Sequence, residues 1–273
     1  MSDGDAGSDG DAGLAWQTGV WDGISRLYRD EIDPRFASVV EGVIGRAGLR
    51  DGDRVLDLGT GTGAVAAEAV RAVGTDGEVV AIDISPEMLA LAAQRAQRDG
   101  LRYVLKEGRA EAIPARDGEF DAVVASLSLM YVIDREAAAQ EIARVLRPGG
   151  RLVAAVWAGK DACDIVLFQQ TAGSFAPAPP VAGVGPGALA DPQPFLDDLA
   201  RAGVAARVEM DLLSFDFRNF DLAWDVLAGV TAAALPPERR EEARTAVRNA
   251  MWAEPDMPRH FRNATQFIIG QRT

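Results

Sequence analysis

Short apolar runs alternate with amphipathic stretches between residues 32 and 157 of this chain. Short continuous apolar runs are typical of buried strands, whereas apolar positions spaced three and four apart are typical of helices that cover a sheet. Because the two patterns alternate, they predict an α/β protein with a doubly wound sheet. The predicted strands are Arg54–Leu58, Glu78–Ile82, Arg102–Leu105, Phe120–Ala125 and Arg151–Trp157, and the helices between them are Ala64–Val73, Pro86–Asp99 and Arg135–Leu146.

The pattern is less regular after Trp157. A helical stretch at 161–171 leads into residues 176–190, where Pro and Gly are frequent, and this composition indicates a surface loop or lid. The remaining predicted elements are helices at Pro194–Ala202, Leu222–Ala233 and Pro237–Trp252, a long strand or strand pair at Val204–Phe217, and a final strand at Ala264–Gln271.

The first thirteen residues have a different character. The unit Ser-Asp-Gly-Asp-Ala-Gly occurs twice in succession, and with no apolar side chain larger than Ala after Met1 it predicts a disordered acidic tail, 1–13. No domain-sized linker follows. We therefore expect a single domain at 14–273, with an N-terminal lid segment (14–31) and inserted substrate-lid segments at about 158–190 and 219–259.

Charge and composition narrow the classes of function. The chain has 41 acidic and 28 basic residues, for a net charge of −13, which disfavours nucleic acid as a partner. Cys163 and His260 are the only residues of their types, so neither an intrachain disulfide nor a metal site built from thiolates or histidines is expected. No secretory signal and no run of about eighteen apolar residues is present, so we expect a cytoplasmic protein without integral membrane association.

The stretch VLDLGTGTG at 55–63 is the main chemical signal. Closely spaced glycines after a buried strand allow a sharp turn and a close approach of backbone to ligand. Asp83 ends the next apolar run, 24 residues after Gly59, where a carboxylate can accept both hydroxyls of a ribose. These features are shared by proteins that bind S-adenosylmethionine and by those that bind dinucleotides, since Gly59, Gly61 and Ala64 also fit the G-x-G-x-x-G/A pattern of nicotinamide and flavin enzymes.

Three further segments separate these alternatives. They are AIDIS at 81–85, GRAEAIP at 108–114, and FDAVVASLSLMYVID at 120–134 followed by EIARVLRPGGRL at 141–152. With the glycine-rich stretch they resemble, in order, the motifs of class I S-adenosylmethionine-dependent methyltransferases, in the branch (methyltransferase type 11) that includes ubiquinone and menaquinone biosynthesis enzymes and natural-product tailoring enzymes. The resemblance covers roughly residues 50–157.

The resemblance implies a Rossmann-like sheet of seven strands in the order 3-2-1-4-5-7-6, in which Ala264–Gln271 belongs to an antiparallel strand. It also implies roles in binding S-adenosylmethionine. Asp57 would hold the methionine end, Asp83 the ribose, and Ile84, Ala110 and Glu111 the adenine. The full set of implied cofactor-binding residues is Asp57, Gly59, Thr60, Gly61, Gly63, Asp83, Ile84, Met88, Ala110, Glu111 and Ser126.

The acceptor side is less defined by sequence. Met130 stands where many members of the family have a histidine, so a mechanism that uses that histidine is not transferred to this chain. Met130, Tyr131 and Trp157 are candidate substrate-binding residues, with a core position the alternative for Tyr131. His260 is a candidate base or acceptor-binding residue, because the start of an antiparallel last strand lies at the carboxyl ends of the parallel strands. A surface or structural role is its alternative.

Three functions are consistent with the sequence. The leading interpretation is methyl transfer from S-adenosylmethionine to an O, N or C atom of a small molecule, in biosynthesis or natural-product tailoring. The acceptor pocket would come from residues 14–31, the loop 176–190 and the helices at 222–252, whose aromatic residues favour a partly hydrophobic acceptor. A non-methylating enzyme that holds the same cofactor, such as a cyclase, is the second interpretation. A nicotinamide oxidoreductase or a silent nucleotide-binding protein is the third.

Overall fold

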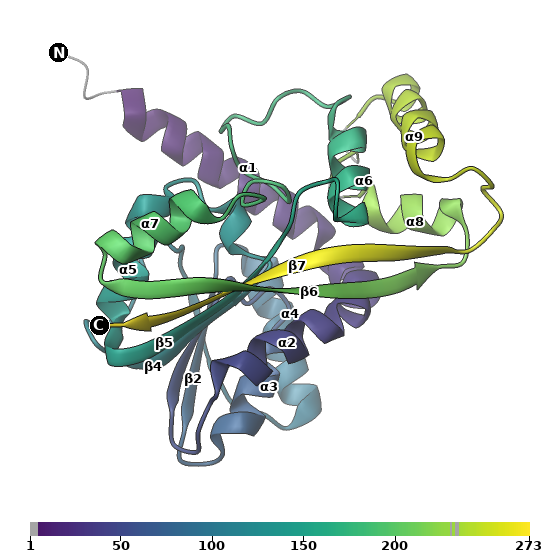
Figure 1. The fold of residues 1–273 in the computed structure, drawn as a ribbon. Helices are drawn as coiled ribbons and strands as arrows, with labels where there is room; N and C mark the ends of the chain where they lie inside the picture. The colour runs from purple at the N-terminus through teal and green to yellow at the C-terminus, as the bar shows by residue number, and fades with distance from the viewer. Residues whose placement is uncertain (1–4, 230, 233–234) are drawn as a thin grey trace.

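A mixed sheet of seven strands organises the chain (Figure 1). The computed structural model describes residues 5–229, 231–232 and 235–273. The strand order is β3-β2-β1-β4-β5-β7-β6, and β7 alone runs opposite to the other six strands. The fold predicted from the sequence is therefore confirmed. The strands are β1 (Arg54–Leu58), β2 (Glu78–Asp83), β3 (Val104–Glu107), β4 (Phe120–Ser126), β5 (Leu146–Trp157), β6 (Val204–Phe217) and β7 (Arg259–Arg272).

Helices cover both faces of the parallel strands, which explains why the central strands are apolar throughout. Helices α2, α3 and α4 lie on one face and α5 with α7 on the other (Figure 1). These helices are α2 (Ala37–Ala47), α3 (Ala64–Val73), α4 (Pro86–Asp99), α5 (Arg135–Val145) and α7 (Gln193–Arg201). The bounds of α3 and α4 match the prediction. Ser85 caps α4 by accepting the N–H of Met88 at 3.0 Å, as its sequence indicated.

Some element bounds differ from the prediction for local reasons. β5 begins at Leu146 rather than Arg151 because residues before the Pro-Gly-Gly turn already pair with β4, with a register shift between the two paired segments. Helix α8 (Phe220–Leu227) begins where Asn219 accepts the N–H of Leu222. It ends well before the predicted Ala233, and residues 230, 233 and 234 lie outside the described residues.

The C-terminal strands extend beyond the parallel sheet. β6 and β7 pair over their whole lengths, whereas β5 pairs with β7 only as far as Trp157 opposite Thr265. The free end of this ribbon carries α6 (Asp164–Gly173), α8 and α9 (Pro237–Met251) (Figure 1). Buried aromatic rings join them: Phe220, Trp252 and Phe261 pack with centroids 5.6 and 5.9 Å apart. These contacts fill the space between the added helices and the ribbon.

The N-terminal segment is helical where the sequence analysis predicted a disordered tail. Helix α1 spans Asp5–Leu27, so residues 5–13 lie in its first turns, and residues 1–4 lie outside the described residues. A single π-helical turn, η1 (Tyr28–Ile32), and a 3₁₀ turn, η2 (Asp33–Phe36), connect α1 to α2. Within the described part of the chain, no helix has both the length and the apolar character to cross a bilayer.

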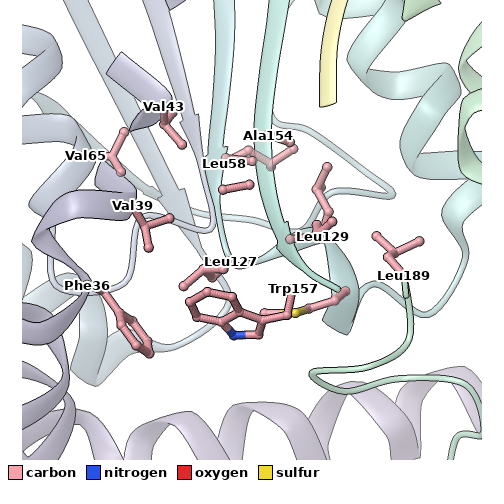
Figure 2. Close-up of a cluster of buried hydrophobic side chains, with 14 of the residues drawn as sticks. Phe36, Val39, Val43, Leu58, Val65, Leu127, Leu129, Ala154, Trp157 and Leu189 are labelled. Carbon is pink, nitrogen blue, oxygen red and sulfur yellow. The ribbon is translucent and has the colours of Figure 1, made fainter. Parts of the chain in front are cut away.

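A buried apolar cluster lies at the carboxyl ends of β1, β4 and β5 (Figure 2). Phe36 meets the indole of Trp157 edge to face, with centroids 5.3 Å apart. Leu189 brings the Pro- and Gly-rich loop into this cluster, and Gln266 holds it there by donating its side-chain N–H to the Leu189 carbonyl at 3.1 Å. The loop is therefore packed against the end of the sheet where open α/β proteins bind ligands.

Candidate active site

The chain turns sharply between β1 and α3. Gly59 and Gly61 have φ angles of +75° and +54°, in the region that favours glycine. A Cβ at Gly59 would lie 2.4 Å from the Cβ of Ser128, so the turn and the segment after β4 meet with no room for a side chain. The N–H groups of Gly59 and Thr60 both donate to the Ile82 carbonyl at 2.9 Å. The turn is thereby fixed against the end of β2.

Asp57 is completely buried beneath this turn. Its Oδ2 accepts the Thr60 hydroxyl at 2.6 Å, whereas its Oδ1 accepts no hydrogen bond from any described residue. Burial raises the pKa of Asp57 to about 7; the Thr60 hydroxyl and the nearby Ala66 N–H oppose the rise, and the charge of Asp83 adds to it. A buried carboxyl with a free oxygen and a raised pKa is typical of a ligand-binding position.

Asp83 ends β2 at the edge of the turn and is 8% exposed. Its Oδ2 accepts the N–H of Gly61 at 2.8 Å, and its Oδ1 accepts the N–H of Ser85 at 3.0 Å. Burial raises the pKa of Asp83, and these backbone hydrogen bonds limit the rise. The backbone thus fixes the orientation of the carboxylate.

A cavity of about 510 Å³ opens above these groups, at the carboxyl ends of β1, β2 and β4. This is the point where the sheet order reverses direction, which is the usual ligand position in doubly wound folds. The residues that line it are Leu14, Gln17, Trp21, Tyr28, Leu58, Gly59, Gly61, Asp83, Ile84, Met88, Gly108, Arg109, Ala110, Glu111, Ser126, Leu127, Ser128, Leu129, Tyr131, Val132, Ile133, Asp134 and Ala137.

Helix α1 covers one side of the cavity and is held there by polar contacts. Gln17 donates its side-chain N–H to the Tyr131 carbonyl at 2.6 Å. The Ser85 hydroxyl donates to Asp22 Oδ1 at 2.5 Å. Between these two contacts the Trp21 indole meets the Tyr131 ring edge to face, with centroids 4.8 Å apart.

The segment after α1 is anchored separately. Asp33 in η2 accepts the Thr62 hydroxyl and forms an ion pair with Arg95 of α4 at 2.6 Å. Arg95 also donates to the Thr62 carbonyl at 2.9 Å. This network of three residues links the glycine-rich turn, α4 and the chain that leads away from α1.

Most of the predicted cofactor-binding residues meet at the cavity. Gly59, Gly61, Asp83, Ile84, Met88, Ala110, Glu111 and Ser126 line it. Asp57, Thr60 and Gly63 are buried just behind the lining. Glu111 accepts the N–H of Ile133 at 3.0 Å through Oε1, so its side chain is fixed at the rim.

The predicted substrate residues divide differently. Tyr131 lines the cavity, whereas Met130 and Trp157 do not. Met130 and Trp157 are only 1% and 3% exposed and pack in the apolar core. Met130 therefore faces the core of this protein rather than the cavity.

His260 is not brought to the cavity. It is the second residue of β7, in the part of the ribbon that extends past β5, and its side chain is 57% exposed. It lies five positions before Thr265, the residue opposite the end of β5, a span of about 17 Å in an extended strand. Its Nδ1 pairs with Asp216 of β6 at 2.8 Å. The predicted strand Ala264–Gln271 would begin at the edge of the parallel sheet, but β7 begins five residues earlier, at Arg259.

Several lining residues were not singled out from the sequence. Leu127 has a φ of +58°, a backbone strain that is concentrated at functional sites and that no sequence signal indicates. Asp134 lies at the rim and caps α5 by accepting the Ala137 N–H at 2.9 Å, so its position was predictable as a helix cap. Among the aromatic residues expected in the acceptor pocket, Trp21 lines the cavity, whereas Trp16 is 41% exposed on the outside of α1.

Residues 56–154 match the family model described as a methyltransferase domain. An uncharacterised protein of Mycobacterium tuberculosis strain H37Rv is 36% identical over 115 residues, 42% of this chain and 41% of that protein. The ubiquinone/menaquinone biosynthesis C-methyltransferase UbiE of Edwardsiella ictaluri is 40% identical over 135 residues, 48% of this chain and 49% of that enzyme. The match thus spans less than half the length of these curated relatives.

The fold has solved counterparts. The crystal structure of the YcgJ protein from Bacillus subtilis aligns with a TM-score of 0.63 at 22% identity, over 86% of this chain and 98% of that one. The matched segment contains the end of β1, the glycine-rich turn and Asp83. It is a class I S-adenosylmethionine-dependent methyltransferase domain of the type 11 branch, so the family and the cofactor predicted from the motifs are confirmed.

Proposed function

We propose that this protein transfers a methyl group from S-adenosylmethionine to a small-molecule acceptor in the cavity beneath α1. The observation that carries the proposal is the arrangement of a glycine-rich turn and two buried carboxyl groups around one cavity at the switch point of the sheet. This arrangement fits the cofactor, because free space lies above glycines and the adjacent carboxyl groups suit hydroxyl donors and a positive charge.

Different residues would bind different parts of the cofactor. Asp83 accepts hydroxyl groups of the ribose, since its oxygens face the cavity while backbone N–H groups hold them. Asp57 acts from below on the positively charged methionine end, either directly or through water. Ile84, Met88 and Ala110 give the adenine an apolar wall, and Glu111 stands at its edge.

When bound, S-adenosylmethionine supplies a methyl group on a sulfonium that departs as a neutral thioether. The protein's contribution is then mainly to position the acceptor and to exclude water. Helix α1 does both, because Gln17 and Asp22 hold it against the loop after β4 and the end of β2. We further propose that 14–31 is the lid of one domain, 14–273, and that about 158–190 and 219–259 are its inserted segments.

Equilibrium binding tests the cofactor site. The product S-adenosylhomocysteine should raise the melting temperature of the full chain, and NAD or NADP should not. Asp83→Asn should weaken S-adenosylhomocysteine binding at least tenfold, because hydrogen bonds to a charged group are lost. Asp161→Asn changes an exposed acid outside the cavity lining and should bind as the parent does.

Turnover tests the reaction. With labelled cofactor and a panel of acceptors, methyl transfer forms one S-adenosylhomocysteine for each methylated product. Conversion of a substrate without S-adenosylhomocysteine formation would contradict methyl transfer and favour a non-methylating enzyme. Stabilisation by NADP alone would contradict the cofactor assignment as well.

A further inference from the structure

Three aromatic rings from three separate segments meet at the cavity. Trp21 comes from α1, Tyr28 from the π-helical turn η1, and Tyr131 from the 3₁₀ turn η3 (Leu129–Tyr131). The indole stands nearly perpendicular to both phenol rings, at 80° to Tyr28 and 89° to Tyr131, with centroids 6.3 and 4.8 Å away. Isolated π-helical turns are frequent at functional sites, and this one directs Tyr28 into the lining.

The two phenol groups are not used within the protein. Neither hydroxyl forms a hydrogen bond with any described residue, and both side chains line the cavity. Burial raises the pKa of both tyrosines, and the charges of Asp33 and Asp83 and the neighbouring Tyr131 raise that of Tyr28 further. Both groups therefore remain neutral phenols, available to a ligand as donors or acceptors.

The charge around the aromatic rings is negative. Asp83, Glu111 and Asp134 line the cavity, and Arg109 is the only basic residue among the lining residues. Aromatic faces and nearby carboxylates together favour a cation, and cages of aromatic rings are the usual site for a quaternary ammonium group. An anionic acceptor such as a phenolate or enolate would meet repulsion here.

We propose that the acceptor is an amine and that Trp21, Tyr28 and Tyr131 hold its nitrogen as positive charge develops on it. The inference rests on the proposed function and names its substrate class. The lone pair of the uncharged nitrogen forms the new N–C bond to the transferred methyl group, and the electrons of the breaking C–S bond remain on sulfur. A tertiary amine gives a quaternary ammonium product; a primary or secondary amine afterwards releases one proton to water.

The lining explains why an amine suits this cavity. A hydroxyl or carbon acceptor needs a base at the site of reaction. The described lining residues include neither histidine nor lysine, and the carboxylates among them, Asp83, Glu111 and Asp134, already accept backbone N–H groups. An amine that has lost its proton to water before the reaction needs no such base. The phenol oxygens and aromatic faces then stabilise the product cation.

Binding of a product-like cation tests the inference without turnover. The full chain, saturated with S-adenosylhomocysteine, is titrated with tetramethylammonium chloride and, at equal concentration, with tert-butanol, a neutral molecule of similar shape. Sodium chloride corrects for ionic strength. We expect tetramethylammonium alone to raise the melting temperature, and Trp21→Leu to weaken its binding about tenfold, as expected for loss of a desolvated cation–π contact.

Matched variants make the test specific. Trp16→Leu removes an exposed tryptophan from the same helix and should bind tetramethylammonium as the parent does. Tyr131→Leu should weaken the binding as Trp21→Leu does, and S-adenosylhomocysteine binding in each variant shows that it is folded. Loss of S-adenosylhomocysteine binding in the parent would contradict the proposed function itself.

Three results would overturn the amine inference while leaving methyl transfer intact. The first is equal stabilisation by tert-butanol and tetramethylammonium. The second is undiminished tetramethylammonium binding in Trp21→Leu. The third is a loss in Trp21→Leu of binding to S-adenosylmethionine but not to S-adenosylhomocysteine, which would assign the rings to the sulfonium of the cofactor.

Discussion

Ser85 joins two parts of the molecule through one hydroxyl group. Its Oγ accepts the N–H of Met88, which caps α4, and donates to Asp22 of α1 at 2.5 Å. Ser85 lies two residues after Asp83 and donates its own N–H to that carboxylate. The position of α1 is therefore coupled to the residue proposed to bind the ribose.

We predict that Asp22→Ala loosens α1 and that Ser85→Ala costs more. Asp22→Ala should lower the free energy of unfolding by about 1 kcal/mol and accelerate S-adenosylhomocysteine release. Ser85→Ala also removes the cap and should cost about 2 kcal/mol. Urea denaturation and stopped-flow tryptophan fluorescence measure the two effects. The double variant should match Ser85→Ala; additive losses would contradict the coupling, and Asp30→Ala, which alters an exposed ion pair in η1, is the control.

The glycine-rich turn gives a pair of variants with different expected costs. Gly59→Ala places an alanine at a φ of +75° with its Cβ 2.4 Å from Ser128. Gly61→Ala places an alanine at a φ of +54° with open space around its Cβ. Gly59→Ala should destabilise the protein by about 3 kcal/mol and Gly61→Ala by about 1 kcal/mol. Both should weaken S-adenosylhomocysteine binding. Equal stabilities would show that the turn and Ser128 do not restrict each other.

The raised pKa of Asp57 predicts a pH-dependent stability. The pKa is about 7 in the folded protein, against an ordinary value of 3.8 for an aspartic acid. Protonated Asp57 therefore makes its full contribution to the free energy of unfolding below about pH 4, and this contribution is lost as the pH rises to 7. Asp57→Asn removes this titration, so the variant should gain stability relative to the parent between pH 5 and 7.5, on the order of a few kcal/mol. Urea denaturation without ligand measures the difference, and a constant difference at both pH values would contradict it.

His260 lies away from the cavity lining, and a variant at this position tests whether it takes part in catalysis. Because its side chain is exposed and, among the described residues, pairs with Asp216 alone, His260→Gln should leave turnover unchanged at every pH. Its stability should stay within about 0.5 kcal/mol of the parent. A pH profile that flattens in this variant would restore the catalytic hypothesis.

The parts of the fold that sequence predicted well are those with strong local signals. The bounds of α3, α4 and β6 were predicted to the residue, because glycines, a serine cap with proline, and alternation of polar and apolar residues mark their ends. The resemblance between residues 50 and 157 also supplied the strand order. That region contains the floor of the cavity, and eight of the proposed cofactor residues line it.

The parts that sequence did not predict depend on contacts between distant segments. The position where β7 begins depends on its pairing with β6, which starts with Arg259 opposite Phe217. The hydrophobic pattern of a strand does not show which other strand it pairs with. The same applies to α1, whose glycine-rich first turns have low helix propensity. Gln17 and Asp22 acquire their roles only through Tyr131 and Ser85.

These distant contacts have a consequence for the order of events during synthesis. Helix α1 precedes both of its polar partners, and the farther one, Tyr131, lies 114 residues after Gln17. At typical rates of translation that interval lasts about 6 to 23 s. During it, the Tyr131 ring against which Trp21 packs has not yet been made. Helix α1 is thus synthesised before the sheet but reaches its final position only after Tyr131 has been made. Until then it is exposed to chaperones and proteases.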